Sequence, residues 1–262
     1  MMKHSLTFTI HPDTENVSVR LFLKTIEDID RLIRDVDYVI TREKGTRRWI
    51  ISELHSSNPT ITISPLLEEP ATVEAIINGV QEITAGTVEP PTHFTEQVLD
   101  DLKRMRRLFR GRDRARRLVL SSMGKETVVE SDIDEKTDRI LKEGYWNLGS
   151  LEGSLEALNL HGQPTFTIWE RVSKAPVRCY FPKESTWTER VKNHLEKPVL
   201  VIGKVNYFLN GSPRSVTNIE NIEDITPSGD LPKATFGSIP NIEVAKDPVA
   251  FLQKVRGEDN RS

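Results

Sequence analysis

The segment of this chain whose composition most directly indicates binding is a run of arginines between residues 103 and 117. This arginine cluster contains nine cations and one carboxylate, Asp113, although the whole chain has a formal net charge of −3. Guanidinium groups make bidentate contacts to phosphates and carboxylates, so the cluster is a candidate phosphate-contacting surface. Its cations are Lys103, Arg104, Arg106, Arg107, Arg110, Arg112, Arg114, Arg116 and Arg117.

Three interpretations of the arginine cluster are open. Its side chains could contact a nucleic-acid backbone, bind an acidic protein partner, or form a solvated or internally paired face. The dipole of a helix favours cations in its last turn whatever the function. No aromatic residue lies between Phe109 and Tyr145, so the run itself offers nothing on which a base could stack.

Trp169, Arg178 and Tyr180 form the second candidate site. They alternate with apolar residues in two segments, 165–169 and 177–181, so we expect them on the outer face of two strands. Aromatic rings that stack and an arginine are the side chains with which proteins bind unpaired bases. The alternative is that a neighbouring domain or a partner covers this face.

The sequence contains no recognisable catalytic or metal-binding motif. The six histidines lack zinc-site spacing, and Asp132, Asp134 and Glu135 fit the start of a helix better than a cation site. The single cysteine, Cys179, falls on an inward strand position and is expected to be an inert packing thiol. We therefore predict no catalytic residue, no metal and no cofactor.

The stretch from 149 to 225 supplies the elements that would position the second candidate site. Gly153 interrupts the first strand and is expected to mark a bulge or bend. Thr186 and Glu189 form a capping box that predicts a helix start, and Asn210-Gly211 predicts a tight hairpin. The expected elements are strands at 149–158, 165–169 and 177–181, a helix from Thr186 to before Pro198, and strands at 199–209 and 215–219.

This order resembles the OB-fold, a small, partly open five-stranded barrel. The resemblance is one of topology and covers roughly a third of the chain. It implies a ligand surface for oligonucleotides, oligosaccharides or proteins over the second and third strands. Those are the strands that carry Trp169, Arg178 and Tyr180.

The first 145 residues have the pattern of a mixed α/β domain. We expect the third helix to carry the first arginines of the cluster at its end. The expected elements are strands at 5–10 and 17–23, a helix capped by Thr25, a hairpin of 48–54 and 60–64, helices starting at Pro70 and near Thr92 or Thr95, a hairpin of 118–121 and 126–130, and a short helix at Asp132.

Together these patterns predict an α+β protein. It comprises an N-terminal mixed α/β domain over 1–145, an OB-like five-stranded β-barrel over 146–226, and a linker with a C-terminal docking helix over 227–262. A charged fraction of 29% against a hydrophobic fraction of 37%, with no leader or membrane-length apolar run, predicts a cytoplasmic protein without a membrane partner.

The function predicted first is a non-enzymatic binding module that holds nucleic acid through the arginine cluster and the barrel face. The alternative is a protein-interaction subunit, such as an antitoxin or a component of a larger complex. An enzyme with dispersed catalytic residues is third. If the N-terminal domain buries Trp169, the nucleic-acid interpretation loses most of its support.

Overall fold

The computed structural model describes residues 4–42, 49–55, 59–66 and 70–225. The predicted linker and docking helix over 227–262 lie outside these residues. The chain divides into two compact units, and the first, Met1–Asp224, contains every element described below. These elements include both helices and strands, which confirms the α+β class.

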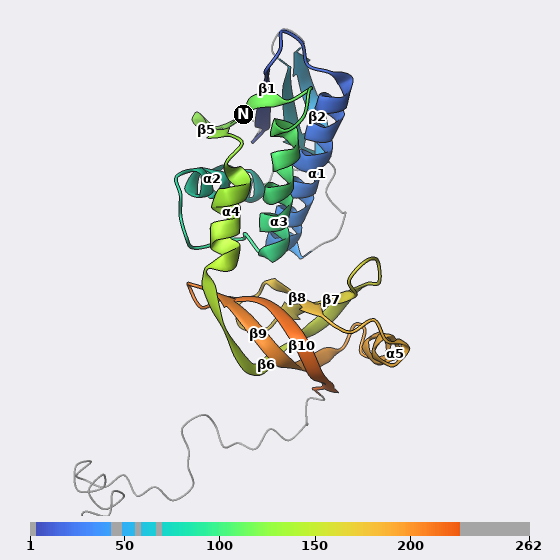
Figure 1. Cartoon of the computed structure of the whole chain (residues 1–262). Helices are drawn as coiled ribbons and strands as arrows, with labels where there is room; N and C mark the ends of the chain where they lie inside the picture. The colour runs from blue at the N-terminus through green and yellow to red at the C-terminus, as the bar shows by residue number, and fades with distance from the viewer. Residues whose placement is uncertain (1–3, 43–48, 56–58, 67–69, 226–262) are drawn as a thin grey trace, which may run out of the picture. The chain divides into compact units, whose positions relative to one another are not determined.

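The N-terminal part is a five-stranded antiparallel sheet with four α-helices (Figure 1). The strands lie in the order β2-β3-β1-β4-β5. Their bounds, with those of the helices, are β1 (Leu6–Pro12), α1 (Val19–Thr41), β2 (Trp49–His55), β3 (Thr60–Pro65), α2 (Pro70–Thr84), α3 (Glu96–Arg104), the 3-10 helix η1 (Met105–Phe109), β4 (Ala115–Ser122), β5 (Lys125–Val129) and α4 (Ile133–Lys142).

The remaining five strands close into a barrel in the order β10-β8-β7-β6-β9. All neighbours are antiparallel except β8 and β10, which pair in parallel. The helix α5 lies between β8 and β9 in the chain. The bounds are β6 (Gly144–Asn159), β7 (Thr165–Glu170), β8 (Pro176–Tyr180), α5 (Ser185–Asn193), β9 (Pro198–Phe208) and β10 (Pro213–Asp224).

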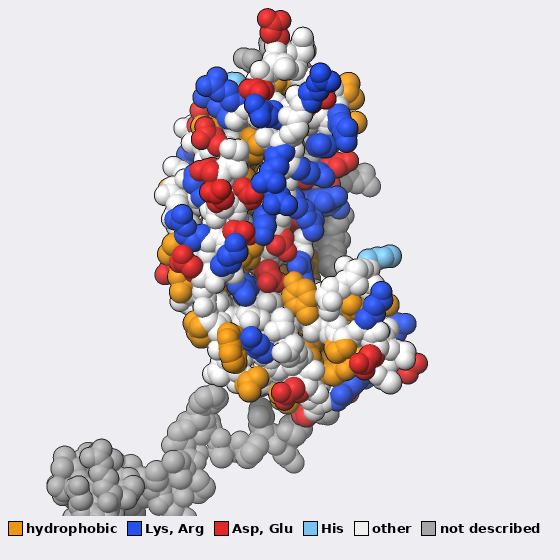
Figure 2. Space-filling view, viewed as in Figure 1, with side chains coloured by type: hydrophobic (Ala, Val, Ile, Leu, Met, Phe, Trp, Pro, Cys, Tyr) orange, Lys and Arg blue, Asp and Glu red, His pale blue; other side chains and the backbone are white. Residues whose placement is uncertain are grey.

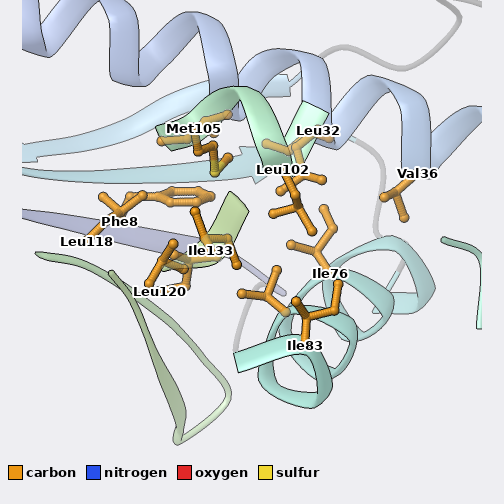
Figure 3. Packing of buried hydrophobic residues seen from close by; sticks show 14 of the residues in the cluster. Phe8, Leu32, Val36, Ile76, Ile83, Leu102, Met105, Leu118, Leu120 and Ile133 are labelled. Atoms are coloured by element: carbon orange, nitrogen blue, oxygen red, sulfur yellow. The ribbon is translucent and has the colours of Figure 1, made fainter. Parts of the chain in front are cut away.

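One face of the first sheet forms the larger hydrophobic core because apolar residues alternate along β1. Leu6, Phe8 and Ile10 are all fully buried. Figure 3 shows Phe8 next to Leu118 of β4 and Met105 of η1. The opposite face carries threonines, and the hydroxyls of Thr7 and Thr62 are hydrogen-bonded across strands at 3.2 Å. The helices therefore cover the apolar face of the sheet.

The barrel has its own core, built from the inward positions of its strands. Val177 and Cys179 of β8, with the adjoining Phe181, are almost completely buried, as the alternation predicts. Phe181 lies 5.9 Å from Phe166 of β7 between ring centroids. Burial raises the pKa of the Cys179 thiol, which leaves it protonated and inert.

The expected strand at 17–23 is wrong, because α1 already begins at Val19. The Ser18 hydroxyl accepts a hydrogen bond from the Leu21 amide at 3.1 Å and caps the helix. Of the alternating apolar residues, Leu21 is buried whereas Val19 is 74% and Leu23 54% exposed. The helical period that continues from Leu21 through the rest of α1 overrides this short alternation.

Gly153 has a different role from the expected bulge. A Cβ atom there would lie 2.4 Å from the carbonyl oxygen of Trp169, so glycine permits the close approach of β6 to β7. The irregularity in this pairing falls instead between Leu155 and Ala157. The capping box also differs, since α5 begins at Ser185 with Glu184 as its N-cap and no side-chain cap bond. None of the helices in the described part of the chain is long and apolar enough to cross a membrane.

Candidate functional site

Trp169, at the end of β7, is covered by the N-terminal helix α1. Trp169 is buried, with only 3% of its surface exposed. The ring of Tyr38 meets it edge-on at a centroid distance of 5.4 Å, and the guanidinium carbon of Arg42 lies 4.3 Å from its ring centroid. Stacking of a base requires an exposed face of the indole ring, and the Trp169 ring is enclosed.

Arg178 and Tyr180 join the barrel to α3. Arg178 Nη1 donates to a carboxylate oxygen of Asp100 at 3.1 Å and to the Tyr180 hydroxyl oxygen at 3.2 Å. The Tyr180 hydroxyl in turn donates to Glu96 at 3.1 Å. Burial raises the pKa of Glu96, and the nearby Arg178 opposes that shift. These contacts hold the two parts of the chain together and occupy the polar atoms that a ligand would need.

A small cavity of about 250 Å³ lies within this junction. Asp35, Glu96 and Arg178 are among its lining residues. Asp35 is hydrogen-bonded to Asp101, and burial together with this bond raises the pKa of Asp101 to about 7. Each of these charged groups already contacts a partner in the same chain, so the arrangement is that of a structural network.

Most cations of the arginine cluster are paired with carboxylates, which come mainly from distant parts of the sequence. Arg107, for example, contacts Asp28 at 2.8 Å and Glu27 at 3.1 Å, both in α1. Figure 2 shows acidic side chains beside a band of cations on the face where α1, α3 and α4 lie. The other ion pairs are Lys103 with Asp138, Arg104 with Asp101 (3.1 Å), Arg106 with Asp134 (3.6 Å), Arg110 with Asp134 (3.3 Å) and Arg114 with Asp13 (2.9 Å).

Arg112 is the one predicted site residue of the cluster that makes no ion pair with the described residues. The paired arginines keep substantial exposure, up to 65% for the side chain of Arg110. Their charge, however, is compensated by carboxylates within a few ångströms, which lowers the local positive potential. The contacts thus correspond to the internally paired face among the three interpretations.

The first barrel strand carries an exposed strip that was not predicted from the sequence. Tyr145, Trp146 and Leu148 of β6 are 52%, 58% and 64% exposed. We call these three side chains, with the backbone of residues 145–151, the β6 strip. Leu148 pairs with Lys204 of β9, whose Nζ lies 4.1 Å from the centroid of the Trp146 ring. The alternation of Trp146 and Leu148 was a usable signal, but the expected strand began only at residue 149.

The backbone of the β6 strip is paired on one edge. β6 pairs with β9 from Gly144 to Ser154, whereas its pairing with the shorter β7 starts at Gly153. Within the described part of the chain, no strand therefore lies along the other edge of residues 145–151. Such an edge presents unpaired N–H and C=O groups to an incoming chain.

A second, larger cavity of about 590 Å³ also escaped the sequence analysis. We call it the junction cavity. The end of α1, the loop before α3 and two loops of the barrel line it, and Trp169 forms part of its wall. Its basic lining residues Arg42, His93 and Lys174 are far apart in the sequence, so no local pattern could have grouped them.

No group of three or more His, Cys, Asp or Glu side chains that could hold a metal ion occurs among the residues described above. Comparison of the chain with protein-family models, with curated proteins and with solved structures finds no match.

Proposed function

We propose that this protein is a non-enzymatic protein-interaction subunit whose β6 strip binds an extended segment of another protein. The observation that carries this proposal is the combination of exposed Tyr145, Trp146 and Leu148 with an unpaired strand edge. An extended peptide can add to such an edge through main-chain hydrogen bonds. Tyr and Trp are the side chains most often found at the energetic centres of protein interfaces.

The strip also defines the chemistry of its partner. Trp146 and Leu148 are two residues apart on one face of β6, so a partner strand would place apolar side chains at the same spacing. Lys204 lies beside them and favours an acidic side chain in the partner. The occupant is therefore an extended, apolar segment of a second protein that also carries a carboxylate.

We propose further that the barrel is an OB-fold, forming a domain over 146–226 that follows a mixed α/β domain over 1–145. Its strand order, the parallel pair β8 and β10, and α5 between β8 and β9 support this assignment. In that fold the face over the second and third strands commonly binds ligands. Here α1 and α3 contact that face, which leaves the first strand as the open surface.

Nucleic-acid binding is the second candidate function. The observation that favours it is the exposure of Arg112, Arg116 and Arg117, which form no ion pair in the described ranges. It would place the nucleic-acid backbone on the arginine cluster and leave the β6 strip unused. A cytoplasmic location remains our proposal for either function, since the lone Cys179 has no need of an oxidising compartment.

Photocrosslinking tests the proposal directly. Benzoylphenylalanine in place of Trp146 should crosslink the full chain to a specific protein in the producing cells, whereas benzoylphenylalanine in place of Leu23 on α1 should not. The identified protein is then purified, and we expect Leu148→Glu to weaken its binding about 10-fold or more. Ile51→Glu is the matched control, because Ile51 is 50% exposed on the edge strand β2 of the other sheet.

Three outcomes would contradict the proposal. One is that positions 146 and 23 crosslink to the same set of proteins. Another is that Ile51→Glu weakens binding as much as Leu148→Glu, which would place the interface on the first sheet. The third is a crosslink from position 146 to residues 226–262 of the same chain, which would make the chain its own occupant.

A further inference from the structure

The junction cavity has a composition unlike the rest of the molecule. None of its described lining residues is Asp or Glu, although the chain has 39 acidic residues and a net charge of −3. Three are basic: Arg42 at the end of α1, His93 before α3, and Lys174 between β7 and β8. A concave site lined by one sign of charge concentrates ligands of the opposite sign.

The backbone at these three basic residues adopts an uncommon conformation. Arg42, His93 and Lys174 have φ values of 63°, 69° and 54°, in the left-handed region that glycine favours. Only three other described non-glycine residues share it: Met123, Glu196 and Asn218. Each left-handed residue costs about 1–2 kcal/mol, and such residues concentrate at ligand sites.

A structural cause accounts for one of the three conformations. Arg42 is the C-cap of α1, and its amide donates to the Tyr38 carbonyl at 2.9 Å, an arrangement that usually has glycine in the left-handed position. No such cap explains His93 or Lys174, which lie in loops. At all three positions a basic side chain occupies a site where glycine would be less strained.

The three basic side chains of the cavity wall have no carboxylate beside them among the described lining residues. In contrast to the arginine cluster, none of Arg42, His93 and Lys174 forms an ion pair with the residues described. The indole Nε1 of Trp169 is buried and has no hydrogen-bond acceptor. A buried donor without an acceptor costs about 1–3 kcal/mol, and this one belongs to a residue that lines the cavity.

The start of α3 adds to the positive character of the cavity. Thr95 lines the cavity as the N-cap of α3 and makes no side-chain cap bond. The first amide groups of a helix carry a partial positive charge and bind anions well. Burial lowers the pKa of His93, so its imidazole contributes hydrogen bonding while Arg42 and Lys174 contribute the charge.

Apolar side chains complete the wall. Pro90, Pro91, Phe94 and Phe208 line the cavity together with the basic residues. The volume of about 590 Å³ is within the range of small-molecule sites. The ligand should therefore combine an anionic group with a compact apolar body.

We propose that the junction cavity binds a phosphate monoester with a compact apolar body. Arg42 and Lys174 hold the phosphate from α1 and from the β7–β8 loop, and the proline and phenylalanine side chains contact the body. This site is separate from the β6 strip and does not depend on the proposed protein partner. A free phosphate monoester and the terminal phosphate of an oligonucleotide share this chemistry, and the test distinguishes them.

The test follows the indole N–H resonance of Trp169 in the full-length protein by ¹H–¹⁵N NMR, with Trp169→Phe to assign the peak. Phenyl phosphate is titrated in, with phenol, inorganic phosphate and a 5′-phosphorylated dinucleotide as comparisons. We expect phenyl phosphate to shift this resonance with a dissociation constant of about 1 mM or lower. We expect phenol to leave it unchanged and the dinucleotide to bind more weakly than phenyl phosphate.

Two cavity variants and one matched control locate the phosphate. Arg42→Gln and Lys174→Ala should each weaken phenyl phosphate binding at least about 10-fold. Arg110→Ala removes an exposed arginine of the cluster instead and should leave the affinity unchanged. The indole resonances of Trp49, Trp146 and Trp187 report whether each variant is folded, and Lys174→Ala keeps the test usable if Arg42→Gln does not fold.

Several results would overturn the proposal. The first is a Trp169 resonance that does not move at about 10 mM phenyl phosphate. The second is equal binding of phenol, which would mean an apolar site without anion recognition. The third is a loss of affinity in Arg110→Ala as large as in Lys174→Ala. Tighter binding of the dinucleotide would assign the cavity to a nucleic-acid end. Leu148→Glu should change none of these titrations, so the failure of either proposal can be recognised separately.

Discussion

The arginine cluster and the wall of the junction cavity are both basic, and they differ in the partners of their charges. The cations of the cluster are paired with Asp13, Glu27, Asp28, Asp101, Asp134 and Asp138. The cavity has fewer cations, and none of its described lining residues is a carboxylate. The availability of a positive charge thus depends on what the fold places beside it, and the number of cations in a stretch of sequence is a poor guide to it.

The largest expected effect concerns pH, because Asp101, the partner of Arg104, loses its proton only near neutral pH. Its pKa is raised from 3.8 to about 7, by burial first and by Asp35 second. Between these two values the native state binds a proton that the unfolded state has released. The free energy of unfolding should therefore fall as the pH rises from about 4 to about 7, by a few kcal/mol.

Urea unfolding at several pH values measures this effect in the wild type and in Asp101→Asn. In the variant, the free energy of unfolding should depend much less on pH, while the amide introduced at position 101 can still form a hydrogen bond with Asp35. Some slope should remain, since burial also raises the pKa values of Asp28 and Glu96. An unchanged slope in the variant would show that Asp101 ionises normally and neutralises Arg104 like the other carboxylates of the cluster.

The next effect separates a paired arginine from an unpaired one within the cluster. Arg107→Ala leaves the buried carboxylate of Asp28 without its partner and should lower the free energy of unfolding by about 2 kcal/mol. This value is below that for a fully buried pair because the Arg107 side chain is 35% exposed. Arg112→Ala is the control and should change the free energy of unfolding by less than about 0.5 kcal/mol. Equal losses would contradict the distinction.

A third experiment removes acidic partners of the cluster, so that its arginines become available to contact phosphates. Asp13→Asn with Asp134→Asn removes the partners of Arg114, Arg106 and Arg110. We expect the double variant to bind labelled single-stranded oligonucleotide about 10-fold more tightly than the wild type at low salt, with a steeper salt dependence. Fluorescence anisotropy at two salt concentrations measures both. If the wild type already binds as tightly as the variant, the paired arginines are available after all.

The smallest effect tests the strain in the cavity wall. Lys174→Gly should raise the free energy of unfolding by about 1 kcal/mol relative to Lys174→Ala, because glycine adopts the left-handed backbone without strain. Both variants should bind phenyl phosphate equally weakly. Thermal unfolding and the NMR titration measure the two properties on the same samples. Equal stability of the two variants would mean that residue 174 stores no strain for the site.

Much of the architecture could be predicted from local patterns. The alternation in 177–181 correctly placed Val177, Cys179 and Phe181 in the core, and Asp132 correctly marked the start of α4. The failures were also local. The alternation of 17–23 indicated a strand, although Ser18 caps a helix there, and the first barrel strand was expected only from residue 149. That late start hid the β6 strip.

The candidate site was less accessible to sequence reasoning, because its properties come from contacts between distant residues. Trp169 was correctly identified as an outward position of the barrel, yet Tyr38 of α1 and its C-cap residue Arg42 enclose it. Arg178 and Tyr180 were predicted to bind a ligand. In the structure they contact Asp100 and Glu96 of the same chain. No local pattern reports a partner about 80 residues away.

The sequence by itself determined the α+β class and the inward face of most strands, because hydrophobic periodicity is set by neighbours within a few residues. It also placed the cations and the aromatic side chains along the chain. Only the tertiary structure decided which of them have partners. Arg114 is paired with a residue 101 positions earlier, whereas Arg42 and Lys174 line one cavity that has no carboxylate among its described lining residues. The physical reason is that electrostatic compensation acts over a few ångströms in space, and the fold alone brings those charges together.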